Sequence, residues 1–247
     1  MSESRIMKLG IRNVGALISH PSVFLNFAVN GSAGAVREAM RISLNQLSHS
    51  SLPLFDTYLK EKRGITLFGK IQGISQEFLY LLIRRYKPLV VVETGVASGF
   101  SSSFILQALA DNKLGKLYSI DFPLASYTAD DGSTIPAVVP KHIKTGFVIP
   151  DNLKSRWELI LGDSRVELPK LLNKLERIDM FYHDSEHTYK MMKWEYETVY
   201  QYMNKPSIIC SDDVNWNLAF QDFCGTYGLT PNLISERAGY ALVPKRY

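Results

Sequence analysis

From residue 75 onward, apolar residues occur in short uninterrupted runs that alternate with stretches of helical spacing. Five such runs are LVVVETG, KLYSIDFP, WELILGDS, IDMFYHDS and SIICSDDV. Continuous runs of this kind, rather than alternating ones, are typical of parallel strands that are covered on both faces. We therefore predict five parallel strands, which begin near residues 89, 116, 157, 178 and 207.

Helical patterns separate these runs. The segment SQEFLYLLIRRY, residues 75–86, is amphipathic and opens with a serine cap, and the following Lys87 and Pro88 end it. Further helices are predicted over residues 188–203 and near 217–228, and two terminal strands around 232–236 and 240–245. Strands that alternate with helices build βαβ units. The predicted fold class is therefore α/β, with a doubly wound sheet of seven strands.

The N-terminal part of the chain differs from the rest. Residues 1–70 show helical periodicity, for example in SAGAVREAMRISLNQL, and no run typical of a strand. We divide the chain into a helical extension over 1–70 and an α/β domain over 71–247. The extension is either a cap over a neighbouring site or a segment that enlarges the core.

One predicted connection is unusually long. Residues 123–156 join the second and third strands and contain four prolines. Loops of this length are uncommon unless they are functional or disordered. This segment is either a substrate lid or an insertion without a function.

Composition excludes some classes of protein. The chain has 247 residues and a formal net charge of +4, which gives no indication of nucleic-acid binding. No apolar run has the roughly 20 residues that a membrane span needs. Cys210 and Cys224 form neither a metal-binding spacing nor a disulfide framework. We expect a cytoplasmic protein that binds neither membrane nor nucleic acid.

Acidic residues follow every one of the five strand-like runs. In open parallel sheets, ligands bind in the crevice beyond the carboxyl ends of the strands. Single acids at such ends are common in turns, but five consecutive strands predict that these carboxylates converge on one crevice. They are Glu93, Asp121, Asp163, Asp184 and the pair Asp212–Asp213.

The first strand leads into a glycine-containing turn. In VVVETGVASGFSSSF, Gly95 and Gly99 allow the backbone to approach a ligand closely. The G-x-G-x-x-G spacing of dinucleotide-binding folds is absent. Glu93, two residues before the first glycine, would repel a pyrophosphate and suits a cationic ligand.

The pattern E-x-G-x-x-x-G-x-S resembles the first motif of class I S-adenosylmethionine-dependent methyltransferases, and the resemblance extends from about residue 75 to the C-terminus. It implies a Rossmann-like sheet, mostly parallel, with one antiparallel strand near the edge. It also implies that Asp121 binds the ribose and that Asp163 and Ser164 flank the adenine, although Asp163 could instead cap a turn. The implied cofactor-binding residues are Glu93, Gly95, Gly99, Ser101, Asp121, Asp163 and Ser164.

The acids of the fourth and fifth strands suggest a metal site. Asp184 and the pair Asp212–Asp213 offer hard oxygen donors, which suit Mg²⁺. The arrangement resembles metal-dependent O-methyltransferases of the catechol type, which have an Asp and an Asp–Asn pair. In having two consecutive acids, this chain is closer to macrolide-sugar O-methyltransferases.

His187 follows Asp184 by three residues, where the macrolide-sugar enzymes have a histidine that acts as general base. A hydroxyl held on Mg²⁺ is acidified, and a neutral imidazole nearby can take its proton. His183 precedes the metal position, and we interpret it as a core residue. For Glu186 we expect an exposed position.

The predicted reaction is methyl transfer from S-adenosylmethionine to a hydroxyl of a small molecule, assisted by Mg²⁺, with His187 as base. Two alternatives are a hydroxylase-type metalloenzyme on the same fold and a non-catalytic module that binds the cofactor. Iron oxygenases usually need two histidines and a carboxylate, which argues against the first. The predicted partner is the hydroxyl acceptor, and assembly into a homo-oligomer is left open.

Overall fold

The structure is a computed structural model, and it describes residues 75–123, 126–128, 132, 134–136, 144–203, 206–235 and 237–244. The prediction of a helical extension over residues 1–70 lies outside the described residues. The boundary at residue 71 therefore stays a prediction.

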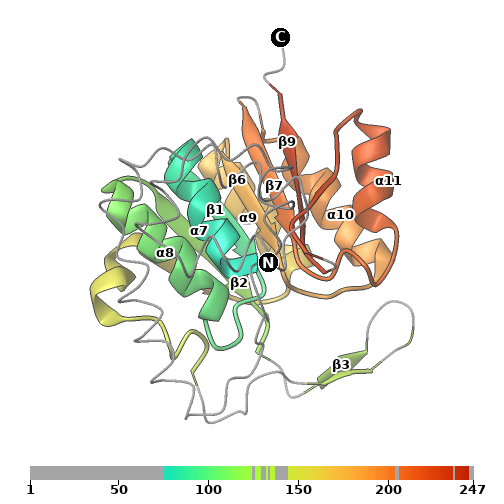
Figure 1. The fold of residues 1–247 in the computed structure, drawn as a ribbon. Helices are drawn as coiled ribbons and strands as arrows, with labels where there is room; N and C mark the ends of the chain where they lie inside the picture. The colour runs from blue at the N-terminus through green and yellow to red at the C-terminus, as the bar shows by residue number, and fades with distance from the viewer. Residues whose placement is uncertain are drawn as a thin grey trace, which may run out of the picture.

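The described part of the chain is built on one seven-stranded sheet with the order β5-β2-β1-β6-β7-β9-β8. Neighbours among β5, β2, β1, β6 and β7 pair in parallel, whereas β9 is antiparallel to both β7 and β8. The predicted Rossmann-like sheet, with one antiparallel strand near the edge, is thus confirmed (Figure 1). The strands are β1 (Val90–Thr94), β2 (Lys116–Asp121), β5 (Trp157–Leu161), β6 (Met180–His183), β7 (Ser207–Ser211), β8 (Asn232–Leu233) and β9 (Gly239–Val243).

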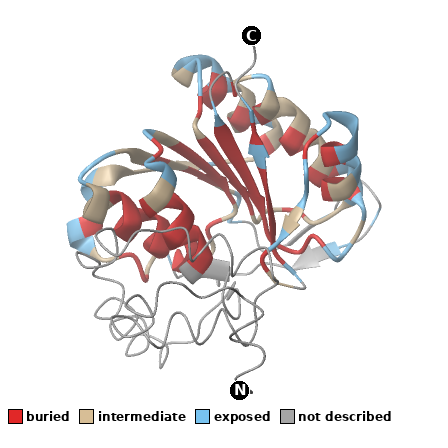
Figure 2. Cartoon of the chain, turned by 45° about the horizontal axis from the view of Figure 1, so that its top comes forward, coloured by how far each residue is buried: buried red, intermediate tan, exposed pale blue. Residues whose placement is uncertain are grey.

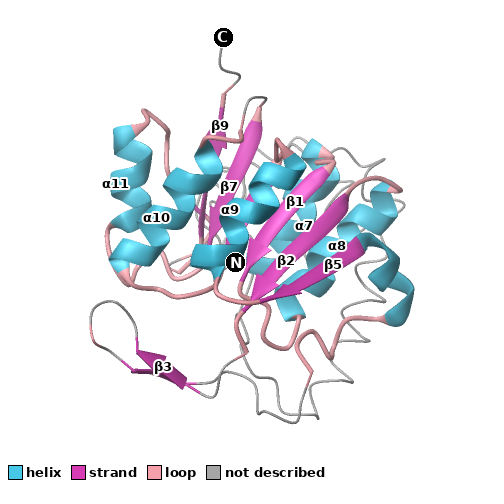
Figure 3. Cartoon of the chain, turned by 180° about the vertical axis from the view of Figure 1, so that it is seen from behind, coloured by secondary structure: helices cyan, strands magenta, loops and turns pink. Residues whose placement is uncertain are grey.

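Helices cover both faces of the sheet, so the fold has three layers (Figures 1 and 3). One face carries α7 (Ser75–Tyr86), α8 (Phe100–Asn112) and the 3₁₀ helix η1 (Asp151–Arg156). The other face carries α9 (Ser164–Leu175), α10 (Tyr189–Tyr200) and α11 (Ala219–Thr226). Because apolar layers lie on both sides, most positions of the central strands are apolar.

The strand β6 shows how this requirement is met. Met180 and Tyr182 pack into the core on the α7–α8 side, and Phe181 packs into the core on the α10 side. All four residues of β6 are buried, and Figure 2 shows the same for the central strands as a group. The uninterrupted apolar runs of the sequence are therefore explained by the three-layer packing.

The long connection between β2 and β5 contains structure that the sequence did not predict. A small antiparallel hairpin pairs β3 (Ser126–Thr128) with β4 (Thr134–Pro136). Near the end of the connection, Val148 and Ile149 are buried, and the N–H of Val148 donates to the carbonyl of Ser98 at 3.1 Å. Residues 144–156 are therefore part of the scaffold, and the lid interpretation can apply only to the segment before them.

Candidate functional site

The ends of three neighbouring strands are aligned at one edge of the sheet. The N–H of Gly95 donates to Ile120 of β2, that of Asp184 donates to Thr94 of β1, and that of Asp212 donates to His183 of β6. These bonds continue the parallel ladder by one residue beyond each strand. The first residue after β1, β6 and β7 is thus held in register, and the predicted glycine turn and both predicted acids lie side by side.

The turn after β1 needs its two glycines for the protein's own packing. Gly95 has φ +82, and a Cβ there would lie 1.9 Å from the carbonyl oxygen of Asp184. Gly99 has φ +87, and a Cβ there would lie 2.8 Å from Cα of Gly146. The close approach shown here is between parts of the chain, and the predicted approach to a cofactor stays a prediction. At Gly95 the partner within the chain is the loop that carries Asp184.

Glu93 faces the interior. Its carboxylate is fully buried and accepts hydrogen bonds from the hydroxyls of Ser101 at 2.9 Å, Ser102 at 2.7 Å and Ser119 at 2.7 Å. Burial raises the pKa of Glu93 to about 7, although the serine hydroxyls oppose the shift. Glu93 and Ser101 thus join β1 and β2 to the first turn of α8. Their predicted contact with a cofactor stays a prediction.

Asp121, at the end of β2, also supports the glycine turn. Its carboxylate accepts the N–H of Val96 at 3.0 Å and the hydroxyl of Thr145 at 2.9 Å. The residue is half-buried at the end of β2, and its predicted contact with the ribose stays a prediction.

Asp163 and Ser164 lie at the start of α9. Asp163 is the N-cap of this helix, because its side chain accepts the N–H of Arg165 at 2.9 Å. The same carboxylate forms an ion pair with the Arg165 guanidinium at 2.8 Å. The alternative of a turn cap is therefore confirmed for Asp163, and its contact with adenine remains untested.

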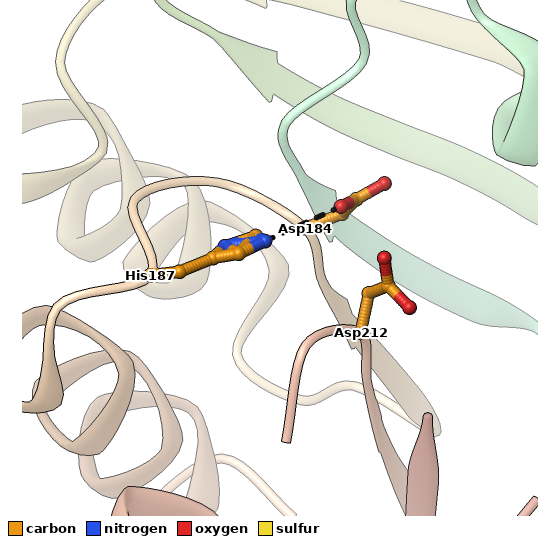
Figure 4. A group of neighbouring side chains, drawn as sticks. All are labelled: Asp184, His187 and Asp212. Atoms are coloured by element: carbon orange, nitrogen blue, oxygen red, sulfur yellow. Dashed lines mark ion pairs between the residues drawn. The ribbon is translucent and has the colours of Figure 1, made fainter. Parts of the chain in front are cut away.

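Asp184, His187 and Asp212 form a cluster at the ends of β6 and β7. Each residue offers one donor atom, and these three atoms all lie within 4.8 Å of one another. Figure 4 shows the imidazole directed toward Asp184, with the carboxylate of Asp212 beside them. Among the described residues, these three form the group of His, Cys, Asp and Glu side chains that could together hold a metal ion.

The surroundings of the two carboxylates in the cluster disfavour their charged forms. Burial and the nearby charge of Asp212 raise the pKa of Asp184 well above its usual range. Burial and the adjacent Asp213 raise the pKa of Asp212 to about 6. The side chain of Asp212 is 3% exposed, yet its Oδ1 has no hydrogen-bond partner within the described part of the chain. Such an orphaned acceptor is costly, and a bound cation would satisfy it.

The third predicted metal ligand, Asp213, has other partners. Its Oδ1 accepts from Arg237 Nε at 2.7 Å and Nη2 at 2.5 Å, and its Oδ2 lies 3.2 Å from Nε2 of His187. Asp213 has φ +49, a conformation that is uncommon for residues other than glycine. Nη2 of Arg237 also lies 3.7 Å from Oδ2 of Asp212, so this arginine contacts both acids. Asp213 is not among the three residues whose donor atoms form the cluster that could hold a metal.

The ring of His187 is fixed by its neighbours. Its centroid lies 5.2 Å from those of His183 and Trp216, and Asn217 donates to its backbone carbonyl at 3.0 Å. Nε2 lies 3.7 Å from Oδ1 of Asp184. Burial lowers the pKa of His187 to about 3, so the ring is neutral at ordinary pH.

A buried carboxylate behind this loop was not predicted. Glu195 of α10 is fully buried and accepts from Thr94 Oγ1 at 2.6 Å and Ser185 Oγ at 2.9 Å. It also lies 2.6 Å from Nδ1 of His183, which is fully buried as expected for a core residue. The signal was present in the sequence, because Glu195 lies on the apolar stripe of its helix, between Met192 and Val199.

Two further residues differ from the sequence-based expectations. Glu186 was expected to be exposed, but it is 6% exposed and accepts the hydroxyl of Thr188 at 2.7 Å. Arg237, in the loop before β9, had no predicted role. No signal in the sequence could have indicated its pairing with Asp213, because the two residues meet only in the folded chain.

Residues 92–214 match a family model described as a methyltransferase domain. The chain is therefore a methyltransferase. Its fold agrees with this, because the matched segment contains the end of β1, the glycine turn and the acids of β6 and β7. No curated protein matches the sequence closely enough to count as a relative.

Solved structures with the same fold include several methyltransferases. An O-methyltransferase from Bacillus cereus in complex with SAH is 13% identical, with a TM-score of 0.52 over 77% of this chain and 91% of that chain. TomG from Streptomyces achromogenes, an O-methyltransferase in complex with SAM, is 12% identical, with a TM-score of 0.52 over 82% and 100% of the two chains. Cofactor-bound Rv0187 from MTB is 15% identical, with a TM-score of 0.57 over 83% and 98%. At these identities the likeness establishes the fold of the methyltransferase.

None of the described helices of this methyltransferase is both long enough and apolar enough to span a membrane.

Proposed function

We propose that this methyltransferase transfers the methyl group of S-adenosylmethionine to a hydroxyl of a small molecule, with a divalent cation at the ends of β6 and β7. Mg²⁺ is the ion that the sequence predicts. The observation that carries the proposal is the pair of half-buried Asp184 and buried Asp212, with the orphaned Oδ1 of Asp212, directly beside the glycine turn. Some of the fold neighbours are O-methyltransferases, which supports a hydroxyl acceptor.

The residues fit both groups. Asp121 and the turn from Gly95 to Gly99 would hold the cofactor at the ends of β1 and β2, where open α/β sheets bind ligands. Asp184 and Asp212 would hold the cation, because two carboxylates are typical of Mg²⁺ sites that leave positions for water or substrate. When bound, a divalent cation supplies a Lewis acid that lowers the pKa of the acceptor hydroxyl.

The chain's own contribution is alignment. Asp184 is bonded through its N–H to Thr94 of β1, and its carbonyl contacts Gly95, so the cation loop and the cofactor turn are held against each other. A rigid junction of this kind fixes the distance between methyl donor and acceptor, and positioning supplies much of the rate in such displacements. The general-base role of His187 stays a prediction.

The alternatives have less support. A hydroxylase that uses iron would need two histidines and a carboxylate, whereas the cluster has one histidine and two carboxylates. A non-catalytic module would have no need for an orphaned buried carboxylate at the cofactor edge. A small-molecule acceptor, a cytoplasmic location and a homo-oligomer remain predictions.

The test is transfer of a labelled methyl group from S-adenosylmethionine to a panel of phenols, catechols and sugars in the presence of Mg²⁺. We expect label to appear in at least one class and to disappear in excess chelator. Cofactor binding, followed by calorimetry, should survive the chelator. Undiminished transfer in chelator would show that Asp184 and Asp212 have a role that needs no cation.

A further inference from the structure

We infer that His187 binds the divalent cation through Nε2, as the third protein ligand beside Asp184 and Asp212, and that Asp213 is not a ligand. This inference rests on the proposed function, since it concerns the same cation. It changes the expected ion from one that prefers oxygen alone to one that accepts nitrogen.

The atoms around Nε2 support this assignment. This nitrogen lies 3.7 Å from Oδ1 of Asp184 and 3.2 Å from Oδ2 of Asp213, and it makes all the polar contacts of the ring, because Nδ1 is buried without a partner among the described residues. A nitrogen lone pair and carboxylate oxygens repel one another. Nε2 therefore either carries a proton, which a neutral ring can donate to one carboxylate, or binds a metal ion.

The distances between the donor atoms also suit a single ion. Ligand atoms bonded to one ion at about 2.0–2.2 Å lie roughly 3–4.4 Å apart. The donor atoms of Asp184, His187 and Asp212 lie within 4.8 Å of one another, so shifts of a few tenths of an ångström would close the site. Asp212 adds a second observation, because its buried Oδ1 has no partner among the described residues and its carboxylate is drawn beside the other two side chains in Figure 4.

The charges of the cluster also fit a divalent cation. Arg237 donates twice to Oδ1 of Asp213, and its Nη2 lies 3.7 Å from Oδ2 of Asp212. The arginine lies on a braced loop, because its carbonyl accepts the N–H of Val214 at 2.7 Å and its N–H donates to Ser235. One guanidinium thus faces the three carboxylates of Asp184, Asp212 and Asp213. Two negative charges remain, which a divalent cation with a neutral imidazole would balance.

The orientation of His187 suits a ligand. Its ring lies between those of His183 and Trp216, and its carbonyl is held by Asn217. Rings that are fixed in this way lose little freedom on binding a metal. One imidazole nitrogen with two carboxylates suits Mn²⁺, Fe²⁺ or Co²⁺ better than Mg²⁺, which prefers oxygen.

The decisive experiment is pulsed electron paramagnetic resonance of Mn²⁺ bound to the full chain, since coupling to a nitrogen nucleus reports an imidazole ligand directly. We expect this coupling in the wild-type protein. We expect His187→Gln, which offers an oxygen donor in place of nitrogen, to remove the coupling and to weaken Mn²⁺ binding by about 10- to 100-fold. The wild-type spectrum decides the question even if a variant fails to fold.

The matched variants are Asp212→Asn and Asp213→Asn, which change neighbouring residues in the same way. The first should weaken Mn²⁺ binding by about 100-fold or more and the second by less than about threefold. Binding that depends on Asp212 but shows no nitrogen coupling would overturn the role of His187. Equal losses in the two variants would overturn the exclusion of Asp213. A complete absence of Mn²⁺ binding would overturn the ligand set, and the chelator assay would then show separately whether methyl transfer needs any cation.

Discussion

Glu195 and Asp212 are both buried carboxylates beside the loop that follows β6, and their surroundings are opposite. Glu195 receives hydrogen bonds from Thr94 and Ser185 and contacts Nδ1 of His183, all within 2.9 Å. Asp212 lies beside other acids, its Oδ2 is 3.7 Å from Nη2 of Arg237, and its Oδ1 has no partner among the described residues. A buried acid that is fully hydrogen-bonded stabilises the fold. A buried acid with an oxygen that lacks a hydrogen-bond partner indicates a ligand-binding site.

The largest effect is expected from replacing Asp212, and it distinguishes a ligand-binding acid from a structural one. Asp212→Asn should lower methyl transfer by at least about 10³-fold, because the cation loses a ligand and with it several kcal/mol of stabilisation. In chelator, the same variant should be more stable than the wild type by about 1–3 kcal/mol at pH 8. The pKa of Asp212 is about 6 in the folded protein and near 3.8 when unfolded, so ionisation disfavours the folded state.

The sign of this stability effect can be checked with pH. Since the folded pKa is the higher one, the penalty is fully present above about pH 6 and disappears as the pH falls below about 4. Urea denaturation in chelator at pH 8 and at pH 4 measures both ends of this window. A variant that is less stable than the wild type at pH 8 would mean that Asp212 is a structural acid like Glu195.

The next largest effect is expected at Gly95, where the glycine turn after β1 contacts the loop that carries Asp184. Gly95→Ala should destabilise the protein by about 3 kcal/mol or more, because φ is positive and the new Cβ would lie 1.9 Å from the carbonyl oxygen of Asp184. Gly228→Ala is the control, since Gly228 also has positive φ but nothing within 4 Å, and it should cost only about 1–2 kcal/mol. Thermal denaturation of the two variants compares them. Equal losses would show that the contact with Asp184 is unimportant.

The smallest of the three effects is expected from replacing Glu195, the fully hydrogen-bonded acid. Glu195→Gln should cost about 2 kcal/mol of unfolding free energy, because an amide can no longer accept at both positions and hydrogen bonds to charged groups contribute more than neutral ones. Glu197→Gln, a less buried position on the same helix, should change stability by less than about 0.5 kcal/mol. Urea denaturation measures both, and a stabilised Glu195→Gln would remove the distinction between Glu195 and Asp212.

The fold could be read from the sequence because it depends on local patterns. The apolar runs located β1, β2, β5, β6 and β7, and α7 was predicted with the bounds that the structure shows. The alignment of acids at one edge followed from the rule that parallel strands end together. The hairpin of β3 and β4 was missed because its strands are short and carry no apolar run.

The side-chain partners of the acids could not be predicted from local sequence patterns. Asp213 was predicted as a metal ligand, and the structure pairs it with Arg237, 24 residues further along the chain. Glu93 has the position that the family resemblance implies, but its carboxylate is enclosed by three serines. Sequence indicates that an acid is present at a strand end, whereas the direction of its side chain depends on the packing of several elements.

Trp216 gives this methyltransferase an optical reporter of its own. Its indole is 65% exposed, and its ring meets that of His187 edge-on, with the centroids 5.2 Å apart. The two other tryptophans, Trp157 and Trp194, are partly buried and pack against the core. Indole fluorescence responds to charge and solvent near the ring, so an acceptor that binds beside His187 should change the emission of Trp216. Unlabelled acceptors could therefore be screened by titration in a fluorimeter, without knowledge of the product.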